Sequence, residues 1–292
     1  MINGIYAASL SLLDKNLALD CKNTIIHAEN IIDNGCHGAV FFGSTGQSQL
    51  ISLSEKIQLI NQLPNSRHKD KFIIGTGLNS LADNINLMKI SKTLNFNTFL
   101  IMPPAYYKYG DEEVINFFSR IVNEINDCKI ILYNFEKLSG YKFSEECIKK
   151  LVQKFPKQIV GVKDSSYNLF ESLKIKNFSI LPGSESKLLK GLELGCSGII
   201  TATTNVTSSL ARNVYDNFSV LQGRTPIKEF HNIVVPDFVT LSYSCTLWTD
   251  YVSQMNKLIE MINYTSDSYW GDKERFHFNA KIDTYNNTTE IS

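Results

Sequence analysis

The chain has 292 residues, of which 43% are hydrophobic and 20% are charged, a balance typical of water-soluble globular proteins. Basic and acidic residues number 29 each, so the formal net charge is zero and the charge balance argues against a nucleic-acid-binding protein. The first residues lack the features of a secretory signal, and no apolar run is long enough to span a membrane. We therefore expect a cytoplasmic protein without nucleic-acid or membrane partners.

The cysteines and histidines do not form a metal-binding pattern. Six cysteines are scattered without a C-x-x-C motif, which in a chain of this length indicates reduced thiols that serve as small core residues. The five histidines lack the H-x-x-x-H spacing of a zinc hydrolase. We expect no metal site.

Short apolar runs alternate along the chain with amphipathic segments. Runs typical of buried strands begin near residues 4, 38, 72, 98, 129, 159, 178 and 198. Between them, apolar residues recur at the spacing of helices. Eight strands, each followed by a helix within about 220 residues, predict an α/β fold of the TIM (β/α)8 barrel type. An open doubly wound sheet is the alternative, but no G-x-G-x-x-G motif follows the first strand.

The barrel prediction covers residues 1–222. Residues 223–292 form a separate C-terminal segment in this interpretation. Only residues 250–264 of that segment have clear helical spacing, and the tail beyond Ser266 is rich in Asn, Thr, Asp and Tyr. We expect this segment to be partly helical or disordered.

Polar residues follow the carboxyl ends of the predicted strands, where barrel enzymes carry their active sites. These residues are Ser44 and Thr45 after the second strand, Tyr133 and Asn134 at the fifth, Lys163 and Asp164 at the sixth, Ser184 and Glu185 after the seventh, and Thr203 after the eighth. We expect them to gather at one rim of the barrel.

Lys163 ends the apolar strand in the stretch IVGVKDSS. Its ammonium could lie just beyond the sheet in water, because lysine is rarely buried. It could instead be a desolvated amine that attacks a carbonyl group and forms a Schiff base. The other rim residues favour the second interpretation, and Gly161 on the same strand face would leave room for a ligand. Tyr133 should lie on the neighbouring strand, as a general acid and base or as a core tyrosine.

The sequence GSTG at 43–46 joins a strand to the next helix. Its N–H groups and the hydroxyl groups of Ser44 and Thr45 could hold a carboxylate near a helix N-terminus, with Gly46 allowing close approach. An ordinary turn and helix cap is the alternative.

Six segments occur in the order and spacing of the dihydrodipicolinate synthase / N-acetylneuraminate lyase family: FFGSTGQSQLISLSEK, MPPAYYKYGDEEVINFF, ILYNFEKLSG, IVGVKDSS, LPGSES and GIITATTNV. Over roughly residues 1–222 the chain thus resembles pyruvate-dependent class I aldolases. The resemblance implies a carbon–carbon lyase on a TIM barrel, with no metal or organic cofactor. It also implies a homo-oligomer, a dimer or tetramer, whose small-molecule partners are a 2-oxo acid such as pyruvate and an aldehyde.

The resemblance also implies roles for individual residues. Lys163 would form the imine with the 2-oxo acid, and Tyr133 would move the proton when the C–C bond is cleaved or formed. Ser44 and Thr45 would hold the substrate carboxylate. Tyr107 would reach across a subunit interface and complete a hydroxyl relay. The backbone of one further residue would line the pyruvate pocket, namely Ile200.

Leu138 separates two branches of that family. Synthases that condense pyruvate with aspartate semialdehyde usually carry an arginine there, which holds the second carboxylate. A leucine cannot form that bidentate pair, and the neighbouring Lys137 offers only a flexible point charge. The LSG sequence is more similar to the sialic acid lyase branch, in which polar groups such as Glu185 would hold sugar hydroxyls. We favour an N-acetylneuraminate or 2-keto-3-deoxy sugar acid substrate over 4-hydroxy-tetrahydrodipicolinate (dihydrodipicolinate) synthase activity.

A non-catalytic barrel that binds a 2-oxo acid is the alternative of another class. Glu136 replaces a proline that is usual in the family, Gln47 replaces a usual glutamate, and residues 223–292 do not match the family pattern. The retained amine and phenol argue against this alternative, because a protein that only binds its ligand would not need both.

Overall fold

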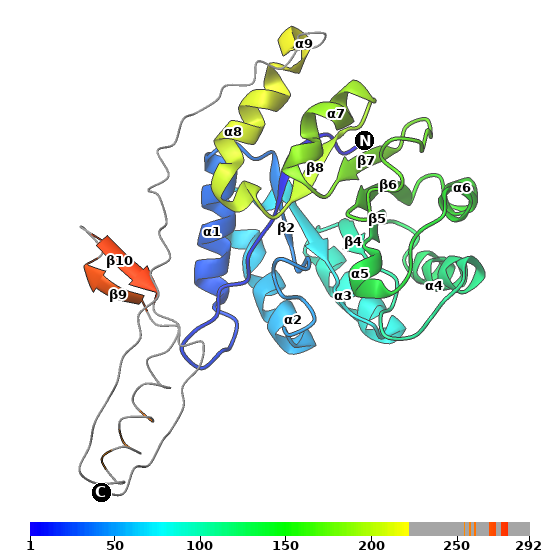
Figure 1. The fold of residues 1–292 in the computed structure, drawn as a ribbon. Helices are drawn as coiled ribbons and strands as arrows, with labels where there is room; N and C mark the ends of the chain where they lie inside the picture. The colour runs from blue at the N-terminus through cyan, green and yellow to red at the C-terminus, as the bar shows by residue number, and fades with distance from the viewer. Residues whose placement is uncertain (222–253, 255–256, 258–259, 261–268, 273–275, 280–292) are drawn as a thin grey trace, which may run out of the picture. The chain divides into compact units, whose positions relative to one another are not determined.

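The computed structural model describes residues 1–221 without interruption, together with residues 254, 257, 260, 269–272 and 276–279. It divides the chain into two units, Met1–Pro226 and Ile227–Ser292. The first unit consists of parallel strands surrounded by helices (Figure 1).

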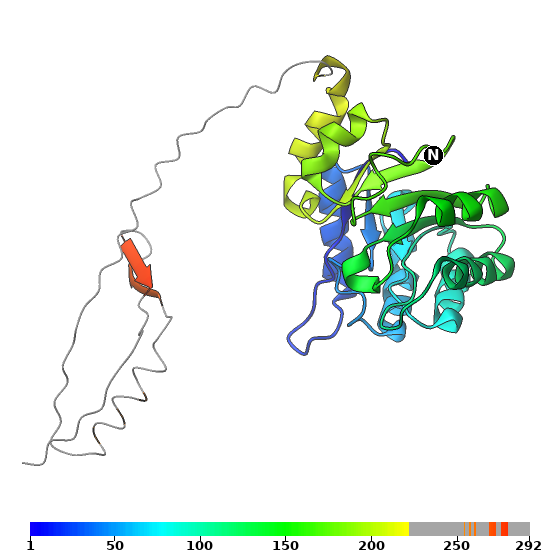
Figure 2. The same cartoon turned by 45° about the vertical axis from the view of Figure 1, so that its right-hand side comes forward.

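Eight parallel strands form a nearly closed barrel in the order β7-β6-β5-β4-β3-β2-β1-β8 (Figures 1 and 2). They are β1 (Gly4–Ala8), β2 (Gly38–Phe41), β3 (Phe72–Gly75), β4 (Thr98–Ile101), β5 (Lys129–Asn134), β6 (Ile159–Asp164), β7 (Ser179–Pro182) and β8 (Gly198–Thr201). Where β7 meets β8, the Ser197 N–H group donates to the Ile180 carbonyl at 2.9 Å. Each strand coincides with a predicted apolar run, and the TIM barrel is confirmed.

Helices cover the outside of the barrel. The α-helices of the first unit are α1 (Cys21–Asp33), α2 (Leu53–Gln62), α3 (Leu81–Thr93), α4 (Asp111–Glu124), α5 (Glu136–Ser139), α6 (Glu145–Lys154), α7 (Leu188–Glu193), α8 (Thr204–Asp216) and α9 (Phe218–Leu221). Short 3-10 helices are η1 (Leu63–Asn65), η2 (Lys69–Lys71) and η3 (Glu185–Lys187).

The prediction of a helix after every strand is wrong between β6 and β7. Residues 165–178 form turns there. The Asp164 carboxylate accepts the backbone N–H groups of Tyr167, Leu169 and Phe170, so this stretch wraps around a buried carboxylate instead of forming a regular helix.

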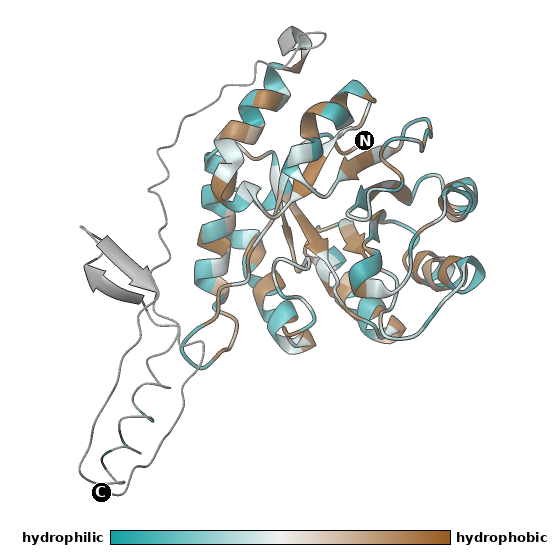
Figure 3. Cartoon of the chain, in the orientation of Figure 1, coloured by the Kyte–Doolittle hydropathy of each residue, from teal (hydrophilic) through white to brown (hydrophobic). Residues whose placement is uncertain are grey.

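The core has two layers. The outer layer lies between the sheet and the apolar faces of the helices, and Figure 3 shows the strands as mainly hydrophobic and the helices as two-sided. The inner layer fills the barrel with one or two side chains from most strands: Ala8, Val40, Ile73, Leu100, Ile131, Tyr133, Leu181 and Ile200. Each large apolar side chain buried in this way contributes about 1.5–3 kcal/mol of transfer free energy.

The second unit contains an antiparallel pair of strands, β9 (Tyr269–Asp272) and β10 (Phe276–Asn279), which the sequence analysis did not predict. The helix expected over residues 250–264 lies outside the described residues, apart from Gln254, Lys257 and Glu260, which are helical. Among the described residues of both units, no helix is long and apolar enough to cross a membrane. Five of the six cysteines are described, and all five are buried free thiols.

Candidate active site

Lys163 and Tyr133 lie side by side on the adjacent strands β6 and β5, where they are partners in the parallel register. Both side chains are buried, with 3% and 4% of their surface exposed. The Lys163 ammonium lies over the face of the Tyr133 ring, with Nζ 4.4 Å from the ring centroid. Such an arrangement stabilises the cation without a carboxylate partner. The ammonium therefore does not lie in water beyond the sheet.

The loop after β2 reaches the same place. The hydroxyl groups of Ser44 and Tyr133 form a hydrogen bond of 2.8 Å, although the two residues are 89 positions apart in the chain. Thr45 is half-buried beside Ser44. The predicted gathering of Ser44, Tyr133 and Lys163 is present at the carboxyl ends of their strands.

The GSTG loop does not lie at a helix N-terminus, contrary to the expectation from sequence. Residues 42–51 form successive turns, and α2 begins only at Leu53 after a capping box in which Ser52 and Glu55 bond each other's backbone N–H groups. Only glycine fits at position 46 without a clash, because a Cβ atom there would lie 2.8 Å from the Ser9 carbonyl oxygen. Carboxylate binding by this loop would therefore use its own N–H and hydroxyl groups.

Gly161 does not leave room for a ligand, as the sequence analysis had expected. A Cβ atom at this position would lie 2.6 Å from the carbonyl oxygen of Ser179 on β7. The glycine instead allows β6 and β7 to approach closely, two residue pairs before Lys163 and Leu181 in the register.

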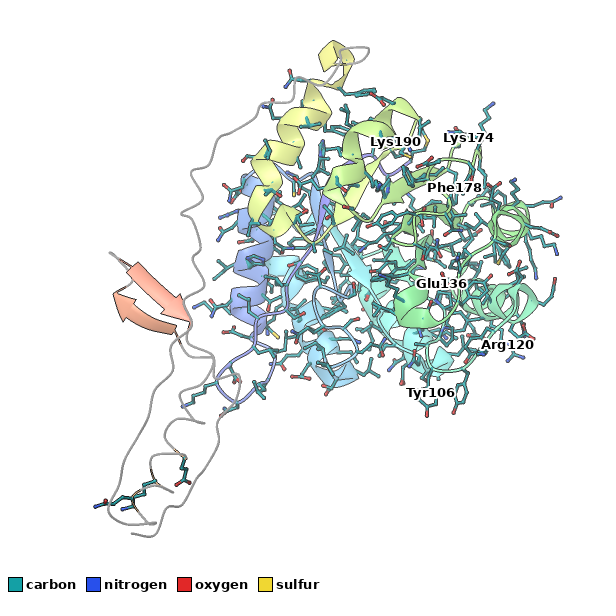
Figure 4. All side chains as sticks on the ribbon, in the orientation of Figure 1. Tyr106, Arg120, Glu136, Lys174, Phe178 and Lys190 are labelled. Atoms are coloured by element: carbon teal, nitrogen blue, oxygen red, sulfur yellow. The ribbon has the colours of Figure 1, made fainter. Side chains whose placement is uncertain are left out.

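Of two further predicted site residues, Ile200 is buried near the Lys163–Tyr133 pair and Tyr107 is exposed. Ile200 is fully buried in the same inner cluster as Tyr133, which is where a residue lining the pocket would lie. Tyr107 is 66% exposed and packs edge-on against the Tyr106 ring, with centroids 5.0 Å apart. Figure 4 shows Tyr106 pointing outward at the edge of the barrel. Within one chain, Tyr107 is thus not buried with the Lys163–Tyr133 pair.

Glu185 and Leu138 lie in the segments that follow β7 and β5. Glu185 is half-buried and accepts a hydrogen bond of 2.7 Å from the Thr207 hydroxyl group on α8. Leu138 is 46% exposed on the short helix α5, next to Lys137, the basic residue of that helix. Glu136, at the start of the same helix and labelled in Figure 4, forms an ion pair of 3.0 Å with Lys142.

The sequence analysis missed a second buried lysine, Lys56. Its side chain is fully buried, Nζ donates to the Gly77 carbonyl at 3.2 Å, and burial lowers its pKa to about 8. The sequence pattern does indicate this burial. Lys56 precedes Leu59, Ile60 and Leu63 at helical spacing and thus lies on the apolar face of α2.

The sequence analysis also gave no role to Asn134 and Asp164, the residues that directly follow Tyr133 and Lys163. Both are fully buried, and the Asn134 amide donates to the Asp164 carboxylate at 2.8 Å. Among the described residues, no three His, Cys, Asp or Glu side chains are grouped so that they could bind a metal ion.

The model of the Dihydrodipicolinate synthetase family matches residues 1–232. The chain belongs to this family. Its members include lyases and aldolases, so the predicted enzyme class is confirmed for the family.

Three relatives illustrate the range of the family. A 4-hydroxy-tetrahydrodipicolinate synthase of Listeria monocytogenes is 32% identical over 206 residues, which cover 68% of this chain and 69% of that protein. A DapA-like lyase of Chloroflexus aurantiacus is 29% identical over 194 residues, which cover 64% and 65%. The structure of the 2-keto 3-deoxygluconate aldolase from Picrophilus torridus is similar with a TM-score of 0.69, 27% identity and coverage of 75% and 80%. The chain thus spans about two thirds of the length of the two curated relatives.

Proposed function

We propose that this chain is a Schiff-base-forming carbon–carbon lyase that cleaves or forms a 2-oxo acid, with pyruvate as one partner. The observation that carries this proposal is the buried Lys163 amine stacked on Tyr133, whose hydroxyl group is bonded to Ser44. An amine, a phenol and a hydroxyl at the carboxyl ends of barrel strands are the groups that imine chemistry requires.

The proposed reaction begins when the neutral Lys163 amine attacks the C2 carbonyl of the 2-oxo acid and forms a carbinolamine. The Tyr133 phenol gives its proton to the departing hydroxyl group, so that water leaves and an iminium and a Tyr133 phenolate remain. In cleavage, the Tyr133 phenolate removes the proton from the C4 hydroxyl group, the C3–C4 bond breaks, and its electron pair passes to the iminium nitrogen. The aldehyde leaves, and the resulting enamine takes up at C3 the proton now held by the Tyr133 phenol. Water then hydrolyses the iminium, which releases pyruvate and restores the Lys163 amine and the Tyr133 phenol. Condensation is the reverse sequence.

The remaining site residues would bind the substrate carboxylate and relay protons. The Ser44 hydroxyl would pass the proton that Tyr133 exchanges and, with Thr45 and the N–H groups around Gly46, would bind the 2-oxo acid carboxylate. Tyr107 would extend the relay from a second subunit, since its hydroxyl lies in an exposed loop of its own chain. We therefore propose a homo-oligomer, a dimer or tetramer, and a cytoplasmic location remains a prediction.

For the second substrate we propose the aldehyde of a sugar acid, as in N-acetylneuraminate or a 2-keto-3-deoxy sugar acid. Support comes from Leu138, which offers no charge to a second carboxylate, and from the half-buried Glu185 carboxylate, which could accept sugar hydroxyl groups. The Picrophilus aldolase acts on a substrate of this class by its name. The Listeria synthase favours the alternative, condensation of pyruvate with aspartate semialdehyde.

Borohydride reduction in the presence of pyruvate tests the imine step. Mass spectrometry should find a reduced pyruvate adduct on the peptide that contains Lys163. Release of pyruvate from N-acetylneuraminate and 2-keto-3-deoxygluconate, compared with consumption of aspartate semialdehyde, then decides between the substrates. A folded protein that binds pyruvate without an adduct would instead be the non-catalytic binding barrel.

A further inference from the structure

The residues behind the Lys163–Tyr133 pair form a closed polar network. Asn134 and Asp164 are register partners one step further along β5 and β6, and both are fully buried. Successive residues of a strand point to opposite faces, so this second pair lies on the outer face of the barrel. Its location directly behind the proposed reacting groups makes it a candidate for setting their geometry.

Every polar atom of the two side chains has a partner. The Asp164 carboxylate accepts the Asn134 amide at 2.8 Å and the three backbone N–H groups of residues 167, 169 and 170 at 2.9–3.0 Å. The second amide hydrogen of Asn134 bonds the Asn168 side chain at 2.8 Å, and its Oδ1 accepts the Phe143 N–H group at 3.1 Å. A buried network of this kind is rigid only while all of its members are satisfied.

The ladder between β5 and β6 is irregular just before the reactive pair. Ile130 pairs with Ile159 but Ile131 pairs with Gly161, so Val160 is an extra residue on β6. A slip by one residue would move Lys163 to the outer face of the barrel. Backbone pairing that is interrupted in this way specifies the register less strongly. The hydrogen bond between the Asn134 and Asp164 side chains lies beyond the irregularity and would compensate for the weaker backbone pairing.

The loop after β6 is held in an unfavourable conformation by the same carboxylate. Tyr167 has a φ of 58°, in the left-handed region that non-glycine residues rarely adopt, and its N–H group donates to Asp164. Such strain persists only where the surroundings impose it. The carboxylate thus connects the loop and β6 to β5 through Asn134.

We propose that the Asn134–Asp164 pair is a positioning device that holds the Tyr133 phenol and the Lys163 amine in register for proton transfer. The inference rests on the proposed function. Neither residue touches the substrate in this proposal. Asp164 aligns the end of β6, Asn134 aligns the end of β5, and their hydrogen bond transmits the alignment between the strands.

A double-mutant cycle on pyruvate alone tests the proposal, so the aldehyde need not be known. The variants are Asn134→Ala, Tyr133→Phe and the combination. The readouts are exchange of the pyruvate C3 protons with D2O, followed by proton NMR, and borohydride trapping on Lys163. If Asn134 acts through Tyr133, Asn134→Ala should slow exchange by about 10- to 100-fold in the wild type. In the Tyr133→Phe background its effect should be within about twofold.

A matched control separates positioning from general destabilisation. Asn84 is also fully buried, and its amide donates to the Leu78 and Ser80 carbonyls at 2.9 and 2.8 Å, outside the β5–β6 pair. Asn84→Ala should lower the melting temperature without changing the ratio of exchange to trapping. A shift of this ratio in Asn134→Ala alone supports positioning, and equal behaviour of the two variants overturns it.

A swapped pair, in which the amide and the carboxylate exchange positions, keeps the test decisive if Asn134→Ala does not fold. Asn134→Asp combined with Asp164→Asn restores one bond with donor and acceptor exchanged, and it should exchange pyruvate protons faster than Asn134→Asp alone. The positioning role is overturned if the swapped pair does not recover the exchange rate, or if the losses of Asn134→Ala and Tyr133→Phe are additive. In either case, an adduct on Lys163 in the wild type would still support the proposed function. If the wild type neither traps nor exchanges pyruvate, the proposed function itself is wrong and the positioning role falls with it.

Discussion

The ammonium of Lys163 lies over the ring face of Tyr133, at 4.4 Å from the centroid, while the Tyr133 hydroxyl group points to Ser44 and bonds it at 2.8 Å. The ring therefore contacts the amine with its face and the loop after β2 with its polar end. The same side chain can stabilise the lysine cation and deliver a proton elsewhere.

The two buried lysines should behave differently when their charge is removed. Lys163→Met should abolish borohydride trapping of pyruvate, because it removes the amine that forms the imine. Lys56 cannot replace that amine, since it lies on α2 and donates to the Gly77 carbonyl. Lys56→Met should retain trapping. Intact-mass spectrometry of both variants after reduction is the measurement. An adduct that persists in Lys163→Met would assign the imine to another amine.

The hydrogen bond between Ser44 and Tyr133 should matter for rate more than for folding. Ser44→Ala removes the partner of the phenol, and we expect a loss of about tenfold or more in the turnover number for the best 2-oxo acid substrate. Ser48 is a buried serine of the same turn region, so Ser48→Ala serves as the control with unchanged turnover. Equal turnover in both variants would remove Ser44 from the proton relay.

The stability of the protein should depend on the charge state of Lys56. Its pKa is lowered to about 8 by burial, whereas the unfolded chain holds the group at the ordinary value of 10.5. Between these values the unfolded state binds more protons, so the contribution of Lys56 to stability rises with pH. Below pH 8 the ammonium is charged in both states and the folded protein bears the full cost of burying it.

Lys56→Met should therefore be more stable than the wild type at pH 7, and the difference should shrink by about 1 kcal/mol between pH 7 and pH 9. Urea unfolding of both proteins at each pH measures it. Taking the difference between the proteins cancels the buried cysteines, whose raised pKa values act on both alike. A difference that does not change with pH would contradict the lowered pKa.

Substitution of the two adjacent tyrosines after β4 should affect turnover differently. Tyr107→Phe should lower turnover by about tenfold if its hydroxyl completes a relay from a second subunit. Tyr106→Phe should leave turnover unchanged, because Tyr106 is 89% exposed and has no assigned role. Turnover of both variants is measured along with their oligomeric state by light scattering. A monomeric wild type with full activity would exclude a relay across subunits.

Gly161→Ala should destabilise the barrel without touching the proposed chemistry directly. Its Cβ atom would lie 2.6 Å from the Ser179 carbonyl oxygen, so β6 and β7 would have to separate, at a cost of about 1–3 kcal/mol. Gly191→Ala on α7 is the control, because its Cβ atom would meet its nearest neighbour, Pro182, at 3.4 Å. Thermal unfolding of both variants decides, and equal melting temperatures would show that the strands can adjust.

The fold could be predicted from local patterns. All eight strands fall on apolar runs bounded by turn residues, because a parallel strand buried on both faces reads as a continuous apolar stretch. The helix predicted between β6 and β7 was wrong because a single buried carboxylate, Asp164, binds the N–H groups of that loop. A long-range or buried polar contact of this kind has no periodic signature.

The sequence alone determined which chemical groups stand at the carboxyl ends of the strands, since strand order and strand ends follow from local apolar periodicity. Lys163, Tyr133 and Ser44 could be named on that basis. Only the tertiary structure decided that the Lys163 ammonium is buried on the Tyr133 ring, that Gly161 serves strand packing, and that Asn134 and Asp164 form a hydrogen bond between the two strands. These features depend on distances between residues far apart in the chain, which are set only when the barrel closes.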